Sequence, residues 1–381
     1  MRILQVPPGY PPMLGGVENS VYELTKHLRS SGNEVTVVTC DPERVGFKSG
    51  VWRLRPHIKL QGDWGEIYFS PLIFKALKKL QYDVVHAHTP RKLPAESVAA
   101  FKLLRKRNMP FIVSIRLINV SLPSLLRGIS DTYRKTIERM MFHLADKIAV
   151  QTLSNRRLLI EQCGVNQDKI VIIPNGVDTE TFDPGTVPLL AKHSEVEGKH
   201  VIISAGRLTS QKGFEYLIKA LPSIKAELSD VVIAFAGSGP LKESLVRLAR
   251  DLGVDDSVMF IGNVSHDEMP AFLASGDVFV LPSLSESFPN IMLEAMAMQR
   301  AMVATRVGVI PETLEDGYTA SLVNPGNPHE LSKSILALLS DDSLRRKMGY
   351  NARDLVEKEY SWDVVASKTL KIYEEILEQK N

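Results

Sequence analysis

Two glutamates in one short segment could bind the hydroxyl groups of a single ligand. Glu286 and Glu294 both follow a predicted strand at 278–281. Pro289 favours the first turn of a helix, so the pattern predicts Glu286 on the loop before that helix and Glu294 inside it. The free N–H groups at the helix N-terminus would suit a phosphate or a sugar. The two carboxylates could then face one ligand, one at ring hydroxyls and the other at a ribose.

Two cations, Arg207 and Lys212, lie on the loop after a predicted strand at 201–204. Arginine offers a planar fork and lysine a flexible point charge, a pair that suits a diphosphate. A solvated loop would also carry such residues. Because a carboxylate is a poor phosphate ligand, the cations and the two glutamates together predict a ligand with both phosphate and polyol parts. A nucleotide sugar fits that description.

Glycines follow two other predicted strands. Gly15 and Gly16 open a helix after the first strand, where the backbone can approach a ligand closely and the helix N-terminus favours an anion. Gly237 lies in Ala-Gly-Ser-Gly-Pro after a strand at 231–236, where small residues leave room for a flat ring, although a tight turn explains them equally well. We expect backbone near Gly237 and Val264 to contact a nucleobase.

The elements that would position these residues alternate between short strands and amphipathic helices, the pattern of a parallel α/β sheet. In the first half the predicted strands are 3–6, 34–39, 83–87, 111–114, 147–151 and 170–173, with helices at 17–31, 71–80, 96–106 and 130–145. In the second half the strands are 201–204, 231–236, 258–261, 278–281, 302–305 and 321–323, with helices at 214–227, 240–251, 267–274 and 289–298. We therefore predict two Rossmann-like doubly wound domains, 1–182 and 183–361, with ligands beyond the carboxyl ends of the strands.

The composition is that of an ordinary globular protein. The chain has 381 residues, of which 44% are hydrophobic and 24% charged, which excludes disordered, collagen-like and disulfide-scaffold classes. Cys40 and Cys163 are far apart, as expected in a reduced compartment. The apolar run at the N-terminus is too short for a signal peptide and no stretch approaches a membrane span. We expect a cytoplasmic protein, with peripheral contact to the cytosolic membrane face as an option.

The charge is unevenly distributed along the chain. Residues 1–180 hold 26 Lys/Arg and 16 Asp/Glu, the remainder 20 and 28, and the basic excess is concentrated at 91–157. Solvated helix faces would explain part of it. An anionic acceptor, or an anionic membrane carrying a lipid-linked acceptor, would explain the concentration. We expect no nucleic-acid partner, and the sequence predicts no oligomeric state.

Taken together, the motifs resemble the retaining glycosyltransferases of family 4, which have the two-domain GT-B fold with facing Rossmann-like domains. The resemblance rests on Gly15-Gly16, Asp83 to His88, Pro174 to Asp178, Gly206-Arg207 with Lys212-Gly213, Gly237 to Pro240, and above all the E-x7-E spacing from Glu286 to Glu294. It implies that Arg207 and Lys212 hold the donor diphosphate, that Glu294 binds the ribose and that Glu286 contacts the sugar as a charge-stabilising group. It further implies a sugar site lined by Phe288, Pro289, Asn290 and Ile291.

The chain departs from the family at one motif. Members commonly carry Thr-x-His-Gly where this chain has Ser114-Ile115-Arg116-Leu117, so Arg116 would contact phosphate or acceptor, or the site is altered. His86 and His88 alternate on a strand end and share a face. No further ligands complete a metal site there, so we predict no metal and place His88 in the cleft or in packing.

The resemblance implies metal-independent transfer, with retention, from a UDP-, GDP- or ADP-sugar to a glycan, a lipid-linked or a small-molecule acceptor, without a further cofactor. It also implies that the C-terminal helix at 362–381 packs back on the N-terminal domain. Three alternatives stay open: a nucleotide-sugar epimerase or phosphorylase of similar fold, a non-catalytic sugar-nucleotide binder, and a two-lobed solute-binding protein.

Overall fold

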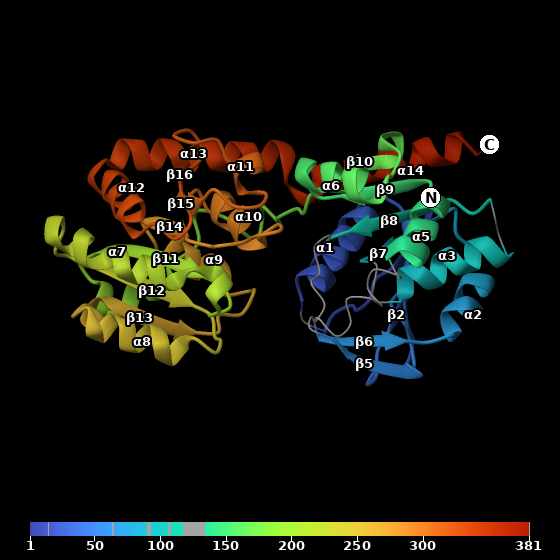
Figure 1. Cartoon of the computed structure of the whole chain (residues 1–381), viewed down its shortest axis with the longest axis horizontal. Helices are drawn as coiled ribbons and strands as arrows, with labels where there is room; N and C mark the ends of the chain where they lie inside the picture. Colours follow the sequence, from blue (N-terminus) through green and yellow to red (C-terminus); the bar gives the residue numbers. More distant parts are fainter. Residues whose placement is uncertain (14, 63–64, 90–92, 106–107, 117–133, 381) are drawn as a thin grey trace. The chain divides into compact units, whose positions relative to one another are not determined.

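The chain forms two compact units in the computed structural model (Figure 1), unit 1 being Met1–Asn175 with Trp362–Asn381 and unit 2 Gly176–Ser361. The structure describes residues 1–13, 15–62, 65–89, 93–105, 108–116 and 134–380. The first unit ends earlier than residue 182, the limit predicted from sequence. The reason is packing, because Val177 and Phe182 are buried in the core of unit 2.

Unit 1 is built on an eight-stranded sheet in the order β10-β9-β8-β7-β1-β2-β4-β3. All neighbours are parallel except β3 and β4. Its strands are β1 (Arg2–Val6), β2 (Glu34–Cys40), β3 (Gly46–Lys48), β4 (Val51–Leu54), β7 (Val84–His88), β8 (Phe111–Ile115), β9 (Lys147–Val150) and β10 (Ile170–Ile172). A separate hairpin pairs β5 (Ile58–Gly62) with β6 (Gly65–Phe69). The central strands are buried along their whole length, as expected where helices cover both faces of a parallel sheet.

The helices of unit 1 are α1 (Gly16–Ser30), α2 (Leu72–Lys79), α3 (Pro94–Arg105), α5 (Arg139–Leu144), α6 (Leu153–Cys163) and α14 (Trp362–Glu378). Part of the helix predicted at 130–145 lies outside the described residues, and 134–138 form a π-type turn that leads into α5. Helix α14, the last in the sequence, packs on α1 and buries Trp362 and Tyr373 against the sheet. The C-terminal segment therefore belongs to unit 1.

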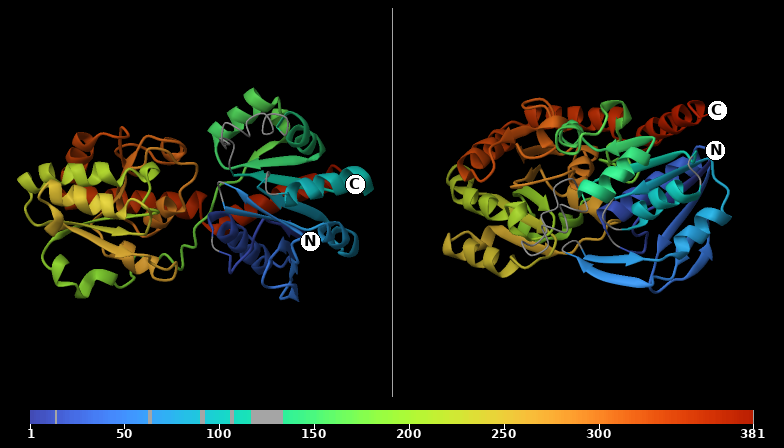
Figure 2. Two further views of the ribbon diagram at one scale, coloured as in Figure 1. Left: turned by 60° about the horizontal axis from the view of Figure 1, so that its bottom comes forward. Right: turned by 45° about the vertical axis from the view of Figure 1, so that its right-hand side comes forward.

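Unit 2 is a six-stranded, fully parallel sheet in the order β13-β12-β11-β14-β15-β16. Its strands are β11 (His200–Ala205), β12 (Val231–Ala236), β13 (Val258–Gly262), β14 (Val278–Leu281), β15 (Ala301–Thr305) and β16 (Ser321–Val323). Helices cover both faces of this sheet (Figure 2), and a buried hydrophobic cluster lies on each face. Helices α7 (Phe214–Glu227), α8 (Lys242–Asp251) and α12 (Pro328–Ser340) share one cluster. Helices α9 (Met269–Ala274), α10 (Asn290–Ala297), α11 (Ile310–Thr313) and α13 (Asp342–Glu359) share the other.

The strand order of unit 2 reverses between β11 and β14. In doubly wound sheets such a reversal opens a crevice beyond the carboxyl ends of the two strands, where ligands bind. The two loops that follow β11 and β14 are those that carry the predicted cations and carboxylates. The two-domain Rossmann-like architecture predicted from sequence is confirmed. Within the described residues, no helix has both the length and the apolar character needed to cross a bilayer.

Candidate functional site

The candidate site lies at the switch point of unit 2, and its central feature is an ion pair between two loops. The Nζ atom of Lys212, after β11, lies 2.6 Å from the Oε1 atom of Glu286, after β14. The Glu286 side chain is 5% exposed and the Lys212 side chain 20%. The Ser283 hydroxyl donates to the same carboxylate oxygen at 2.6 Å. Two residues predicted to serve different parts of the ligand are thus in direct contact.

Close packing of three loops fixes the position of Glu286. Gly213 (φ 64°) leaves no room for a Cβ atom beside the Pro282 carbonyl, and Gly308 (φ 55°) leaves none beside the carbonyl of Glu286 itself. Both glycines also have left-handed backbone that other residues adopt only with strain. The loops after β11, β14 and β15 therefore pack backbone against backbone, and a backbone bond from Leu284 N–H to the Gln211 carbonyl (2.8 Å) joins the first two.

Arg207 occupies the same edge of the sheet with a different environment. It lies two residues beyond β11, its side chain is exposed, and within the described residues its guanidinium makes no ion pair. A charged fork held at a strand end in this way can turn toward an anion without first breaking an internal contact. Lys212, by contrast, is already paired with the carboxylate of Glu286.

Glu294 lies on α10, as predicted, with its side chain partly buried. Burial raises the pKa of its carboxyl group from the usual 4.5 to about 7. It makes no hydrogen bond to the part of the chain that the structure describes. A carboxylate without internal donors is suited to accept hydrogen bonds from the hydroxyls of a ligand. Pro289 is the N-cap of α10 and Asn290 its first residue, so the helix begins one residue later than predicted.

Because the folded chain holds the Glu294 proton more tightly than the unfolded chain, ionisation of this group opposes folding. The penalty is absent below pH 4.5, grows as pH rises, and is complete above pH 7. We therefore expect Glu294→Gln to be more stable than the wild type at pH 8, by about 3 kcal/mol, and to match it at pH 4. Denaturant unfolding at both pH values measures this difference. Exposed Glu243 on α8 is the control, and a similar gain for Glu243→Gln would contradict the explanation.

The glycine loop after β12 packs on the loop after β11. A Cβ atom on Gly237 would clash with the Gly206 carbonyl, and one on Gly239 would lie 2.5 Å from the Leu208 carbonyl oxygen. Tight backbone packing therefore explains these glycines. Val264, on the loop after β13, is partly buried against the core.

The residues between the two glutamates pack largely inward. Phe288 is 8% exposed, and its ring centroid lies 6.4 Å from that of Tyr360. Ile291 is partly buried against the same core, Pro289 is buried and Asn290 is partly exposed. Their predicted role as a sugar-site lining stays a prediction, and their packing accounts for how the segment from Glu286 to Glu294 is held in place.

In unit 1 the glycine pair at the start of α1 is in contact with a glutamate. Gly15 is the N-cap of α1, and a Cβ atom there would clash with the carboxylate of Glu18, whereas Gly16 faces open space. The helix N-terminus that was predicted to favour an anion thus already has a carboxylate folded against its cap residue.

His88 and Arg116 lie at neighbouring strand ends of unit 1. His88 ends β7 and is fully buried, while Arg116 follows β8 and is partly buried. The Asn175 side-chain oxygen accepts hydrogen bonds from Arg116 Nη1 and from Gln151 Nε2, the latter at 2.8 Å. Burial lowers the pKa of Arg116 to about 10, so its guanidinium is still cationic at neutral pH.

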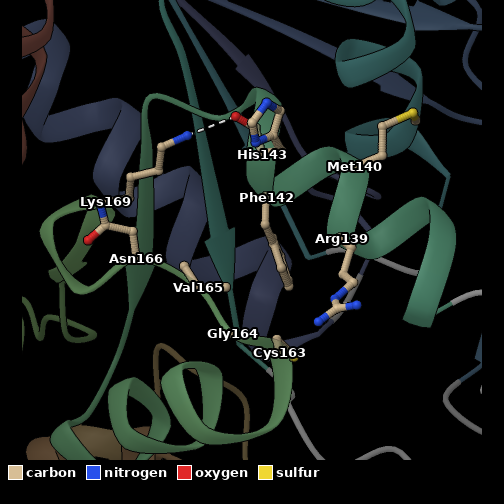
Figure 3. A pocket seen from close by; sticks show the side chains of 9 residues that line it. All are labelled: Arg139, Met140, Phe142, His143, Cys163, Gly164, Val165, Asn166 and Lys169. Carbon is tan, nitrogen blue, oxygen red and sulfur yellow. Dashed lines mark hydrogen bonds between the residues drawn. The ribbon is translucent and has the colours of Figure 1, made fainter.

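A hollow of about 520 Å³ lies in unit 1, between α5, the end of α6 and the turn that leads into β10 (Figure 3). Arg139 and His143 are exposed at its edge. The Lys169 amine donates to the His143 carbonyl at 2.8 Å and to the Ala145 carbonyl at 2.9 Å, so it caps the end of α5. The hollow is lined by residues of unit 1, among them Arg139 of the basic segment 91–157, so it is not part of the switch-point site of unit 2.

Two kinds of site residue were not predicted from sequence. Ser283 and Gly308 position Glu286, and Asn175 and Gln151 position Arg116. Pro174 to Asp178 served in the sequence analysis only as a motif of the family resemblance, with no role given to Asn175. A hydroxyl three residues before Glu286 was the available signal for Ser283, whereas Gly308 gave none, because its neighbour is the backbone carbonyl of Glu286 on another loop.

Two Rossmann-like units, with cationic and acidic loops at the switch point of the second, match the GT-B architecture expected from the sequence. Residues 189–355 match the family model described as glycosyl transferases group 1, and residues 14–181 match that of glycosyltransferase family 4. The chain is 30% identical to the phosphatidyl-myo-inositol mannosyltransferase of Mycolicibacterium smegmatis, over 99% of this chain and 94% of that one. It is 28% identical to the sulfoquinovosyl transferase of Arabidopsis thaliana, over 93% and 69%.

Solved structures agree on the fold. A glycosyltransferase from Rickettsia africae superposes with a TM-score of 0.76 at 22% identity, covering 99% of this chain and 98% of that one. The Anabaena protein HepE, solved in complex with UDP, gives 0.77 at 20% identity, covering 98% and 100%. The chain belongs to glycosyltransferase family 4. It is a group 1 glycosyltransferase that takes its sugar from a nucleotide-sugar donor.

Proposed function

We propose that this enzyme is a retaining glycosyltransferase that moves a sugar from a UDP-, GDP- or ADP-linked donor to a hydroxyl of an anionic or lipid-linked acceptor, with no metal ion and no further cofactor. The observation that carries the proposal is the contact between Lys212 and Glu286 beside the exposed Arg207. It places cations suited to a departing diphosphate next to a carboxylate suited to the positive charge that develops on the sugar.

In the proposed reaction the bond from the anomeric carbon to the diphosphate breaks while the acceptor oxygen bonds to the same face of that carbon. The departing phosphate oxygen takes the acceptor proton. Arg207, Lys212 and the N–H groups at the start of α10 stabilise the leaving charge electrostatically. Glu286 positions the sugar and stabilises its charge, and Glu294 accepts hydrogen bonds from the ribose. Gly237 and Val264 mark the loops proposed to meet the nucleobase.

The proposed acceptor class is supported by the relatives. One relative is named for phosphatidyl-myo-inositol, and another, the D-inositol 3-phosphate glycosyltransferase of Corynebacterium glutamicum, is 25% identical over 96% of this chain and 89% of that one. Both names describe a polyol bearing a phosphate. We propose an acceptor of that chemistry, free or lipid-linked.

The test is a donor screen followed by product stereochemistry. We expect one class among UDP-, GDP- and ADP-sugars to raise Tm and, with an acceptor, to release nucleotide. The first-formed product should keep the anomeric configuration of the donor, which proton NMR reads from the anomeric coupling. An inverted product would overturn the retaining assignment, and nucleotide release that needs no acceptor would favour an epimerase.

The basic region supports contact with an anionic surface. Among its described residues, Arg105, Arg139 and Arg157 are exposed, and Arg139 borders the hollow shown in Figure 3. Lys102 is different, because it is buried and paired with Asp146 at 2.8 Å, and burial lowers its pKa to about 8. The basic residues Arg91, Lys92, Lys106, Arg107 and Arg127 lie outside the described residues.

We expect the protein to sediment with vesicles that contain anionic lipid and not with neutral vesicles, and added salt should weaken the binding. Arg139→Gln and Arg157→Gln should each reduce binding by about 1 kcal/mol, whereas the control Lys333→Gln, exposed in unit 2, should not. Equal binding to neutral and anionic vesicles at low salt would exclude the membrane version of the proposal.

A further inference from the structure

A chain of buried hydrogen bonds runs through unit 1 from β8 to β7. His86 Nε2 lies 2.6 Å from Ser114 Oγ, and His86 Nδ1 lies 2.6 Å from the Tyr373 hydroxyl. Gln5 Nε2 donates to that hydroxyl at 3.1 Å, and Gln5 Oε1 lies 2.6 Å from His88 Nε2. All five side chains are buried. Helix α14 thus supplies, through Tyr373, the link between the two histidines.

Both imidazoles in this chain are neutral. Burial and the nearby Arg116 cation lower the pKa of His86 to about 3, and the same causes, together with His86, hold that of His88 well below its usual value. The two rings also stack with centroids 4.1 Å apart, where two positive charges would repel. A neutral imidazole carries one N–H group and one bare nitrogen, so each ring has a definite donor and acceptor.

The hydrogen bonds determine which ring nitrogen of each histidine carries no proton. The Gln5 oxygen can only accept, so His88 Nε2 carries the proton. The Tyr373 hydroxyl accepts from the Gln5 amide and therefore directs its own proton to His86 Nδ1, which leaves His86 Nε2 to donate to Ser114. With the Gln5 amide oriented as it is in the structure, every bond in the chain is satisfied by this arrangement. It leaves a lone pair on Nδ1 of His88.

That nitrogen and one neighbouring N–H group are both unpaired. Within the described residues, His88 Nδ1 and Arg116 Nε are buried without a hydrogen-bond partner. Both side chains line the same small cavity, of about 10 Å³, together with Ser114 and Gln151. This volume is close to that of one water-sized oxygen. Buried polar atoms without partners are uncommon and call for an explanation.

The two atoms have complementary needs. His88 Nδ1 requires a donor and Arg116 Nε–H requires an acceptor, and a hydroxyl group is both through one oxygen. A sulfate or carboxylate oxygen offers only acceptors and would meet the lone pair of His88. An ammonium group offers only donors and would meet the charge of Arg116.

We propose that His88 Nδ1 and Arg116 Nε form a subsite for one hydroxyl group of a polyol ligand, and that Tyr373 is the positioning residue that keeps the imidazole of His88 in its accepting form. The proposal rests on the proposed function, which supplies polyol ligands. It gives a specific role to Arg116, the residue at which the sequence departs from the motif expected from the resemblance. The hydroxyl belongs either to the donor sugar or to the acceptor.

The first experiment is long-range proton–nitrogen NMR on full-length protein with nitrogen-15-labelled histidine, with His88 assigned through His88→Gln. The wild type should show a bare Nδ1 and a protonated Nε2 at His88, unchanged from pH 5 to 8. Tyr373→Phe keeps the ring and removes the hydroxyl, so it should mix the two forms at His88 while the fold is retained. A protonated Nδ1 at His88 in the wild type would overturn the assignment of the bare nitrogen. A purely accepting form of His88 in Tyr373→Phe would overturn the positioning role of Tyr373.

The second experiment adds ligands to the same sample. The probes are myo-inositol, the nucleotide sugar that raises Tm most among UDP-glucose, GDP-mannose and ADP-glucose, and sulfate, which carries no O–H group at this pH. We expect the bare Nδ1 signal to move with the polyol whose hydroxyl binds, identifying either acceptor or donor, and to stay unchanged with sulfate. His88→Phe should raise the KM for that same ligand about tenfold, with a smaller change in kcat.

If no polyol moves the signal while a nucleotide sugar still raises Tm and is turned over, the subsite is wrong and the proposed function stands. If no nucleotide sugar binds at all, the proposed function itself fails. A sulfate-induced shift of Nδ1 would also overturn the subsite, because an acceptor-only ligand cannot satisfy both atoms.

Discussion

Glu286→Gln is expected to lower kcat by about 100-fold while it changes the KM for the donor only slightly. Gln keeps the size of Glu286 and an oxygen that can accept from Lys212 and Ser283, both of which bind Oε1, so the loop should stay in place. What is lost is the negative charge. That charge matters most when positive charge develops on the sugar, so its loss appears in kcat rather than in KM.

The comparison variant is Glu294→Gln, which removes a carboxylate of the same segment with a different partner. Because Glu294 is proposed to accept hydrogen bonds from the ribose in both ground and transition states, its loss should raise donor KM more than it lowers kcat. Steady-state kinetics with one donor measures both variants. Equal effects of the two substitutions on kcat and KM would contradict the separate roles proposed for Glu286 and Glu294. They would not contradict the family assignment.

Lys212→Ala and Arg207→Ala are each expected to lower kcat/KM for the donor by about 2 kcal/mol or more, which is roughly 30-fold, because charge-assisted bonds to phosphate are among the stronger ones. Their effects on folding should differ. Arg207 is exposed, so Arg207→Ala should leave Tm unchanged. Lys212→Ala leaves the buried Glu286 carboxylate without its counter-charge and should destabilise the protein by about 1–3 kcal/mol.

A double-mutant cycle isolates this coupling. Adding Glu286→Gln to Lys212→Ala removes the unpaired charge and should restore most of the lost stability, without restoring activity. Arg207→Lys is the control for the shape of the cation, since it keeps the charge and loses the fork. Wild-type kinetics in both alanine variants would remove the two cations from the proposed diphosphate site.

Much of the fold followed from hydrophobic periodicity. The predicted strands of the two main sheets are found with ends that differ by one residue, because central parallel strands are uninterrupted apolar runs between turn residues. The segment at 41–70 was not predicted, and it holds β3, β4 and the hairpin of β5 and β6. Exposed residues such as Phe47 and Ile58 occur there, so burial gives no clear alternation.

The candidate site was predictable only in part. Arg207, Lys212, Glu286 and Glu294 were found because charged residues at strand ends of an α/β sheet are few and conspicuous. The contact between Lys212 and Glu286 was not predicted, because side-chain pairing across loops depends on how three loops pack. The histidines show the same limit: His86 and His88 were seen to share a face, but their partner Tyr373 lies on α14, far along the chain.

Helix α14 has a consequence for how the protein folds during synthesis. Unit 1 needs this helix, since Trp362 and Tyr373 complete its core, yet these residues are made only after the whole of unit 2. Unit 2 is a continuous segment and contains all the strands of its own sheet. Domains usually fold in the order in which they are made. Here the second unit can reach its native state first, while the earlier-made part of unit 1 still lacks the helix that covers apolar residues of its sheet.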